Sequence, residues 1–222
     1  MENIKRNSYP VYFSIILLFI LCMGFIYLKA QDKTYKSVKD SLLVKEKINQ
    51  VSQQTKTITS DFIQTKRLSF LEEDIICRGR FYFKRENKLR WEYSDPFFYL
   101  IIFNNDTILV QDDEKTSSFD ASSNRMFKEI NDIMLSIVNG TILNNEKFCF
   151  EYFENDQYYI LDLSPHDSGI KDFLEKIRMF FNKNDYSIVE LMMIERSGDF
   201  TNIKFYNKTL NEKISNHIFD LD

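Results

Sequence analysis

The chain has 222 residues, of which 44% are hydrophobic and 28% charged, and its formal net charge is −4. This length suits one domain preceded by an address segment. Because a modestly acidic chain with dispersed Lys and Arg residues lacks the basic field that a phosphate backbone requires, we exclude nucleic acid as a partner.

The N-terminal residues have the pattern of a secretory signal peptide. Lys5 and Arg6 precede an apolar run over residues 11–28, and the small Ala30 stands before a polar stretch. We predict cleavage near Ala30, which leaves residues 31–222 as a single exported domain. As a helix the apolar run would extend about 27 Å, close to the roughly 30 Å core of a bilayer. An uncleaved membrane anchor therefore stays open as the alternative.

The first element of the exported part is a predicted amphipathic helix over residues 35–55. Its apolar residues recur at loose helical spacing among Lys, Glu and Gln, and the segment contains neither Pro nor Gly. A strand over residues 58–66 follows, in which Ile58 and Phe62 share a face. We expect the helix to lie across the sheet to which this strand belongs.

Two strands with one apolar face come next, over residues 75–84 and 88–93. In the first, apolar or small residues alternate with mostly polar ones. The apolar side consists of Ile75, Cys77, Gly79, Phe81 and Phe83. The second strand repeats the pattern with Leu89, Trp91 and Tyr93. A sheet so strongly two-sided must cover its apolar face, either with protein or with a hydrophobic ligand.

A change of period marks a second helical segment in the middle of the chain. Strands are predicted over residues 97–103 and 107–111, and the Ser- and Thr-rich residues 116–124 are predicted to be a surface loop. The next apolar residues follow helical spacing over residues 126–138. Asn139-Gly140 is a good stop for this helix.

The C-terminal third returns to strands joined by turns rich in Asn, Asp, Ser and Gly. These strands cover residues 148–153, 158–163, 176–181, 188–195 and 200–206, and a last short strand is predicted over residues 217–221. The chain thus has about ten antiparallel strands, which curl naturally into a barrel or half-barrel. The predicted fold class is mainly β with helices: an incomplete barrel whose helical lid covers a hydrophobic cavity.

The chain is poor in catalytic and metal-binding groups. It has two histidines, His166 and His217, and none of the usual nucleophile, phosphate-loop or zinc motifs. His166 with Asp167 and Asp162 is the best candidate for a metal or acid–base cluster, but solvated loop residues account for them more simply. We therefore predict that the protein is not an enzyme and has no catalytic residues, no metal and no cofactor.

Two cysteines follow the signal segment. Strand alternation places Cys77 with Phe81 and Phe83, whereas Cys149 lies opposite Phe148 and Phe150. We predict two separately buried thiols, with a disulfide between them as the alternative in an exported protein.

Several of these motifs together resemble the LolA family of lipoprotein carriers. They are F-x-Q-x-K beginning at Phe62, G-x-F-x-F-K-R beginning at Gly79, and L-R-W-E-Y beginning at Leu89, followed by Pro96. The order of elements extends the resemblance to roughly residues 38–220. It implies an incomplete barrel with a helical lid, in agreement with the fold class expected from the strands.

The candidate site is the cavity between sheet and lid. The chain has 21 Phe, 12 Tyr and 7 Met, and a one-layer curved sheet with a thin lid cannot pack its concavity as densely as a two-layer core. The predicted cavity residues are Phe62, Phe81, Phe83, Leu89, Trp91 and Tyr93. The predicted lid residues are Met126, Phe127, Ile130, Met134 and Ile137. The alternative is that all of them belong to an ordinary core.

Arg85 is the predicted clamp of the lid. The resemblance implies this role, since family members carry at this position an arginine implicated in holding the lid, and a guanidinium has five donors with which to bind carbonyls. A solvated arginine in a charged turn is the alternative. The next residue, Glu86, stands where the family commonly has Pro, which leaves the local backbone open.

The resemblance implies a non-enzymatic carrier in the periplasm. It would accept the acyl chains of lipoproteins from an inner-membrane release complex and deliver them, as a monomer, to an outer-membrane receptor. Because an apolar cavity does not specify a head group, carriage of another lipid or a glycolipid fits the same fold. An alternative of another class is a sensor or interaction module, anchored in the inner membrane and facing the periplasm, whose cavity is packed shut.

Overall fold

The computed structural model describes residues 35–105, 107–120, 125–166, 168–172 and 174–220, and Tyr35–Asp222 forms one compact unit. The predicted signal peptide over residues 1–30 lies outside the described residues. Within the described ranges, no helix combines the length and the apolar character needed to cross a membrane.

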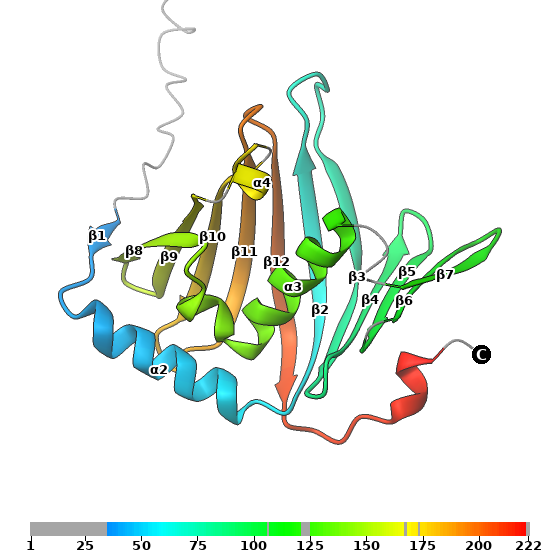
Figure 1. Cartoon of the computed structure of the whole chain (residues 1–222), viewed down its shortest axis with the longest axis horizontal. Coiled ribbons are helices and arrows are strands. Elements are labelled where there is room, and N and C mark those ends of the chain that lie inside the picture. The colour runs from blue at the N-terminus through cyan, green and yellow to red at the C-terminus, as the bar shows by residue number, and fades with distance from the viewer. Residues whose placement is uncertain (1–34, 106, 121–124, 167, 173, 221–222) are drawn as a thin grey trace, which may run out of the picture. The chain divides into compact units, whose positions relative to one another are not determined.

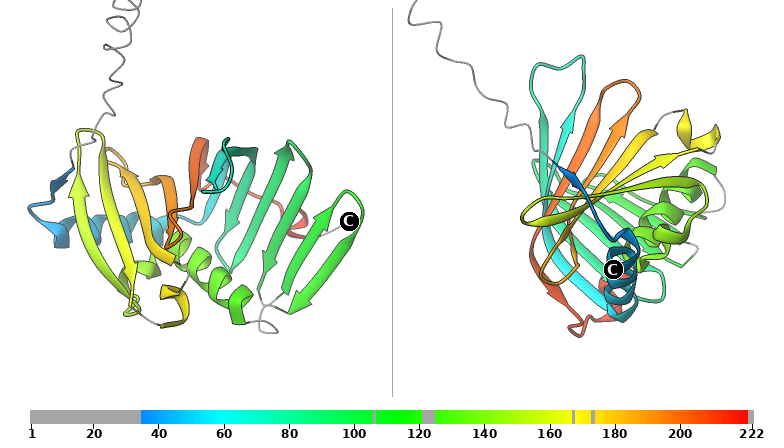
Figure 2. Two further views of the ribbon diagram at one scale, coloured as in Figure 1. Left: turned by 90° about the horizontal axis from the view of Figure 1, so that it is seen from above. Right: turned by 90° about the vertical axis from the view of Figure 1, so that its left-hand side faces the viewer.

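One sheet of twelve strands, paired antiparallel throughout, makes up most of the described unit (Figure 1). In their order across the sheet, the strands are β1 (Lys36–Ser37), β8 (Phe148–Glu154), β9 (Tyr158–Pro165), β10 (Leu174–Asn182), β11 (Ile188–Glu195), β12 (Phe200–Leu210), β2 (Thr57–Arg67), β3 (Ile75–Lys84), β4 (Lys88–Asp95), β5 (Tyr99–Asn104), β6 (Thr107–Asp112) and β7 (Thr116–Asp120). The edge strands are β1 and β7, and the sheet curves without closing (Figure 2). The predicted incomplete barrel is confirmed, with twelve described strands instead of about ten.

All of the described helices except η3 (Asn216–Phe219) lie on the concave side of the sheet. The helices are α2 (Ser41–Gln54), α3 (Arg125–Asn139) and the short α4 (Ser168–Lys171), together with the 3-10 helices η2 (Thr141–Asn144) and η3 (Asn216–Phe219). Figure 1 shows α3 crossing in front of β12, β2 and β3, while α2 runs along the ends of the strands. The exception is η3, which packs on the other face of the sheet.

The β3 and β4 strands follow the predicted alternation. Phe81 pairs with Trp91 and Phe83 with Leu89, and all four side chains are buried in the main core. Gly79 shares this face at the point where the register between the two strands shifts. A Cβ atom at Gly79 would lie 1.9 Å from the carbonyl oxygen of Glu92, so only glycine fits this approach.

The N-terminal helix is shorter than its predicted range of residues 35–55. The carboxylate of Asp40 accepts a hydrogen bond from the Leu43 amide at 2.9 Å, which caps α2 and fixes its start at Ser41. The preceding residues pair with β8 as the short strand β1. Because Asp40 offers the helix its first cap, the residues before it remain extended.

Two further segments differ from expectation. The predicted loop over residues 116–124 begins with a strand, β7, which pairs with β6. The predicted strand over residues 217–221 is instead the 3-10 helix η3, whose Phe219 is buried against Leu100 and Ile102. The Arg90 guanidinium donates to the carbonyl oxygen of Ile218 at 2.9 Å and so holds the C-terminal segment against the sheet. Side-chain packing on the sheet thus replaces strand pairing.

The two cysteines of the described part are both free thiols, as predicted. Cys77 is buried on the core face of β3, but Cys149 is exposed on β8. The prediction of two buried thiols was therefore wrong for Cys149. The reason is the alternation itself: the neighbouring Phe148 takes the buried position and turns Cys149 to solvent.

Candidate binding cavity

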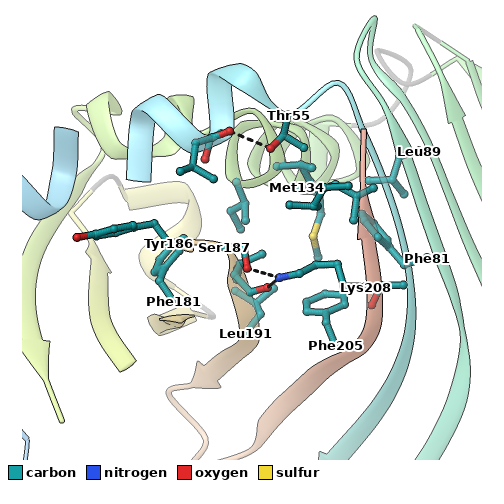
Figure 3. A pocket seen from close by; sticks show the side chains of 18 of the residues that line it. Thr55, Phe81, Leu89, Met134, Phe181, Tyr186, Ser187, Leu191, Phe205 and Lys208 are labelled. Carbon is teal, nitrogen blue, oxygen red and sulfur yellow. Dashed lines mark hydrogen bonds between the residues drawn. The ribbon is translucent and has the colours of Figure 1, made fainter. Parts of the chain in front are cut away.

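An apolar cavity lies between the two long helices and the concave face of the sheet (Figure 3). Its helical side consists of Val51, Ser52 and Thr55 from the end of α2 and Met134, Ile137 and Val138 from α3. Its sheet side consists of Ile58, Ser60, Phe81, Leu89, Trp91, Phe181, Tyr186, Ser187, Ile188, Leu191, Phe205, Lys208 and Leu210. Both halves of the sheet contribute, because β12 pairs with β2 in its middle.

The cavity is small and partly open to solvent. About 60 Å³ is open to the centres of water-sized molecules. Since one water needs roughly 10–15 Å³ on this measure, the cavity has room for a few small groups but not for a long acyl chain. A larger ligand requires the helices to move away from the sheet.

Three hydroxyl groups on the cavity wall form hydrogen bonds with the protein. Thr55 donates to the carbonyl oxygen of Val51 at 2.8 Å, at the end of α2. The Ser60 hydroxyl lies 2.8 Å from the carbonyl oxygen of Tyr206 and binds strand β12. Ser187 donates to the Asp185 carboxylate at 2.6 Å. The wall therefore offers a ligand mainly carbon surface.

Among the described residues that line the cavity, Lys208 is the one with a charge. Its ammonium group donates to the carbonyl oxygen of Ile188 at 2.8 Å and to the hydroxyl of Ser187. Burial lowers the pKa of Lys208, and the nearby Asp185 carboxylate offsets only part of this effect. In Figure 3 the Lys208 side chain runs between Met134 and Phe205 with its nitrogen toward Ser187.

The predicted cavity residues of the sheet fall into two groups. Phe81, Leu89 and Trp91 line the cavity. The structure places Phe62, Phe83 and Tyr93 elsewhere in the main core and not among the lining residues. Phe62 lies behind the wall, where its ring centroid is 5.0 Å from that of Trp91 and 5.1 Å from that of Tyr93.

The C-terminal half of helix α3 covers the cavity, as expected for the predicted lid. Met134 and Ile137 line the cavity, and the neighbouring Val138 joins them. The side chains of the other predicted lid residues, Met126, Phe127 and Ile130, lie outside the described residues. Gly140 ends the helix with φ of 76°, a left-handed conformation that glycine adopts without strain.

Arg85 forms a clamp, but the helix it ties is α2. Its side chain donates to the carbonyl oxygens of Ser52 at 2.6 Å and Thr55 at 3.1 Å, and its amide donates to Lys56 at 2.7 Å. These carbonyls end α2, where no further helical turn can satisfy them. Arg85 was predicted to contact the helix over residues 126–138. Its described hydrogen bonds are instead with the end of α2.

A close contact joins the clamped end of α2 to the end of α3. A Cβ atom added at Gly140 would lie 2.5 Å from the Cβ atom of Ser52, whose carbonyl oxygen accepts from Arg85. Both Ser52 and the last turns of α3 line the cavity. A chain of contacts thus connects Arg85 with the end of α3 through Ser52.

The family model described as outer membrane lipoprotein carrier protein LolA matches residues 53–222. The chain belongs to the LolA family. A search among curated proteins finds no match.

The chain is similar to several solved structures at low sequence identity. A LolA superfamily protein from Nitrosomonas europaea is 12% identical with a TM-score of 0.44, over 81% of this chain and 96% of that one. A putative outer membrane lipoprotein-sorting protein domain from Vibrio parahaemolyticus is 10% identical with a TM-score of 0.47, over 80% and 95%. The lipoprotein LppX of Mycobacterium tuberculosis is 11% identical with a TM-score of 0.44, over 78% and 97%.

The departure from the LolA pattern at Glu86 has a backbone explanation. Glu86 has φ of 88° and Asn87 has φ of 58° in the turn between β3 and β4. A proline ring fixes φ near −65°, so proline cannot occupy this position in the observed turn. Glu86 is therefore compatible with a turn backbone that excludes proline, and Arg85 before it contacts the end of α2.

Sequence reasoning missed the half of the cavity formed by β10, β11 and β12. The strands were predicted, but the pairing of β12 with β2 connects segments more than a hundred residues apart. Lys208 was missed for a local reason as well. Between Tyr206 and Thr209 the register shifts against β2, and Asn207 has φ of 51°. This bulge reverses the alternation, so that Lys208 faces the cavity on the same side as Phe205.

The best catalytic or metal candidate of the sequence does not form a site in the described part. No group of three or more His, Cys, Asp or Glu side chains there could hold a metal ion. His166 is exposed, and Asp167 lies outside the described residues. Asp162 is not solvated as expected: its side chain is 1% exposed and accepts from Arg178 at 2.6 and 2.7 Å and from Lys176 at 2.9 Å. It joins strands β9 and β10.

Proposed function

We propose that this LolA family member is a periplasmic carrier that binds the acyl chains of lipoproteins and shuttles them from the inner to the outer membrane. The observation that supports this proposal best is the apolar cavity under α3, with Phe81, Leu89 and Trp91 on the opposite wall. Each methylene buried there contributes roughly 0.8 kcal/mol. Affinity thus comes from carbon surface rather than from specific polar contacts.

Loading requires the lid to open. The closed cavity holds only a few small groups, so an acyl chain must displace α3 and take over its contacts with the sheet. Release then follows from the recovery of those contacts when the lid closes. Such a cycle needs a closed empty state of moderate stability, because a ligand shifts the balance only by its difference in affinity for the two states.

The carrier role implies two partners and an export route. An inner-membrane complex would supply the lipoprotein and an outer-membrane receptor would take it, with this protein acting between them as a monomer. The predicted signal peptide over residues 1–30 would bring the chain to the periplasm. Mature protein that begins near Gln31 would support export, and full-length protein in salt-washed membranes would support the anchored alternative.

A transfer assay tests the carrier proposal. Inner membranes that carry a labelled acylated lipoprotein are incubated with the purified full-length chain, and label is followed into the soluble fraction and then into outer-membrane vesicles. Ile137→Asp places a charge against the cavity and should abolish transfer. Asn139→Asp adds the same charge at the end of α3, away from the cavity wall, and should retain it. Wild-type transfer by Ile137→Asp would count against this cavity as the acyl site.

The small volume of the cavity also favours a second candidate, an interaction module whose cavity stays packed shut. Native mass spectrometry on protein isolated from its own envelope separates the two functions. Bound lipid, whether from a lipoprotein or another source, supports a carrier. A chain without lipid whose melting temperature does not respond to acyl ligands supports the interaction module.

A further inference from the structure

Lys208 is placed in the cavity by a specific feature of β12. Phe205 faces the cavity, so regular alternation would turn Lys208 to the opposite face. The bulge at Asn207 reverses this alternation and brings both Lys208 and Leu210 to the cavity wall. The Ser60 hydroxyl, 2.8 Å from the carbonyl oxygen of Tyr206, holds the strand just before the bulge. Bulges of this kind commonly re-aim a side chain at a functional site.

Two described acceptors bind the ammonium group of Lys208, which leaves its third hydrogen atom for a ligand. An ammonium has three donors, and two of them are directed at Ser187 and the carbonyl oxygen of Ile188. Both of these acceptors are uncharged. The Asp185 carboxylate, whose charge acts on Lys208, accepts a hydrogen bond from the Ser187 hydroxyl at 2.6 Å. No ion pair of Lys208 is present among the described residues.

Burial of this charge costs free energy that a bound anion would reduce. Burial lowers the pKa of Lys208, and an oxyanion beside the ammonium would favour its charged form again. The side chains of Phe81, Leu191 and Phe205 surround this position with apolar groups, which strengthen such a pair. A purely apolar ligand would gain nothing from Lys208.

We propose that the cavity binds an acidic amphiphile, whose carboxylate or phosphate oxygen pairs with Lys208 while its acyl chain lies against Phe81 and Trp91 under the opened lid. The proposal rests on the acyl binding of the proposed function and adds a head group that an ester-linked acyl chain alone lacks. Fatty acids and acidic phospholipids share this chemistry.

The test uses three ligands with the same sixteen-carbon chain: palmitate, hexadecyl phosphate and hexadecanol. Binding to the purified full-length chain is followed by the emission of Trp91, the single tryptophan, which lies on the cavity wall. Both anions, or one of them, should bind at least tenfold tighter than the alcohol. A preference for palmitate alone indicates a fatty acid, and one for hexadecyl phosphate alone indicates a phospholipid head group.

Variants assign the preference to Lys208. Lys208→Met should lose the preference for anions but still bind hexadecanol, whereas Lys204→Met, an exposed lysine on the same strand, should keep it. Thermal melting checks folding, and Lys208→Gln repeats the test if the Met variant does not fold.

The outcomes separate this inference from the carrier proposal. Equal binding of alcohol and anions by the wild type would overturn the role of Lys208 and leave acyl binding intact. A preference for anions that survives in the folded Lys208 variants would also overturn it. Absence of any response to all three ligands would reject both the acidic ligand and acyl binding in this cavity.

Discussion

Two charged residues, Lys208 and Asp162, lie on opposite faces of the curved sheet and differ in their partners. Lys208 lies in the cavity on the concave side, whereas Asp162 is buried on the opposite face from Leu161 and Leu163, which belong to the main core. Asp162 is satisfied by two cations, while Lys208 has only uncharged partners. The first arrangement stabilises the fold, and the second leaves binding capacity for a ligand.

Replacing Asp162 by Asn should be strongly destabilising. Loss of one partner from a buried ion pair typically costs about 3–5 kcal/mol, and here two cations, Arg178 and Lys176, would remain. Desolvation raises the pKa of Asp162, but the hydrogen bonds and charges of these two residues outweigh it and the net pKa is lowered. The contribution to stability is therefore present above about pH 4, the unfolded pKa, and is lost as the pH falls through the lower folded pKa.

Urea unfolding at several pH values measures this effect. The difference between wild type and Asp162→Asn should be largest near pH 7 and shrink below about pH 4. Asp74→Asn is the control, because its partner Arg67 is 55% exposed and such surface pairs contribute about 1 kcal/mol or less. Equal losses in the two variants would show that Asp162 is no more important than a surface carboxylate.

The turn after Arg85 gives a second prediction at this scale. Glu86 pays a conformational cost at φ of 88°, which glycine would avoid. Glu86→Gly should therefore stabilise the protein by about 0.5–1 kcal/mol, and Glu86→Pro should destabilise it by more than that. Thermal melting of the two variants checks the prediction. A stabilising Glu86→Pro would mean that the turn can adopt the backbone common in the LolA family.

At the scale of elements, the two helices of the concave side act as a connected pair. Arg85 satisfies the last carbonyls of α2, and Ser52 in that turn touches Gly140 at the end of α3. Contacts therefore connect the end of β3 with α3, which covers the cavity, through the end of α2. We predict that a change at the end of β3 affects the lid through these contacts.

Arg85→Leu should loosen both helices. Hydrogen bonds to a charged group contribute roughly 1.5–3 kcal/mol each. Loss of the two carbonyl contacts should therefore raise amide exchange at the end of α2 and at the end of α3. Arg85→Lys should restore only part of the protection from exchange, because the ammonium group lacks the forked geometry of the guanidinium. Hydrogen exchange with mass spectrometry measures this, together with the transfer assay.

Arg80→Leu is the matched control for Arg85. Arg80 lies on the same strand, is 65% exposed and reaches Asp61 only at 3.6 Å. This variant should leave exchange in both helices unchanged. Unchanged exchange in Arg85→Leu as well would show that the hydrogen bonds to Ser52 and Thr55 do not control the lid.

At the scale of the whole unit, a single curved layer is completed by helices that fill its concavity only partly. The cavity draws its wall from both halves of the sheet because β12 pairs with β2, and its cover from α2 and α3. We therefore expect that a change which stabilises the empty form weakens ligand binding, and the reverse. Contacts that hold α3 on the sheet are the contacts that a ligand must replace.

Met134→Ala tests this opposition. Truncation of a methionine in the cavity wall should lower the stability of the empty form by about 2 kcal/mol, at the low end of the range for core positions, and should tighten acyl binding because the closed state loses a contact. Met192→Ala, on β11 outside the cavity wall, should lower stability without a gain in binding. Chemical unfolding and titration with palmitate measure the two quantities. Weaker palmitate binding by Met134→Ala would contradict the opposition.

The sequence by itself determined the longer strands, the two long helices, the apolar face of β3 and β4, the helix end at Gly140 and the family. These features depend on local periodicity and on short motifs, which are written in consecutive residues. It also indicated that Arg85 binds helix carbonyls, and it named Phe81, Leu89 and Trp91, which line the cavity.

Only the tertiary structure decided which helix Arg85 ties, that Asp162 is buried between two cations, and that Lys208 faces the cavity. The first two depend on which distant segments pack together. The third depends on a one-residue bulge, which reverses the faces of every later residue in the strand. Period-two reasoning fails at such a point, and here that point supplies the charge of the candidate site.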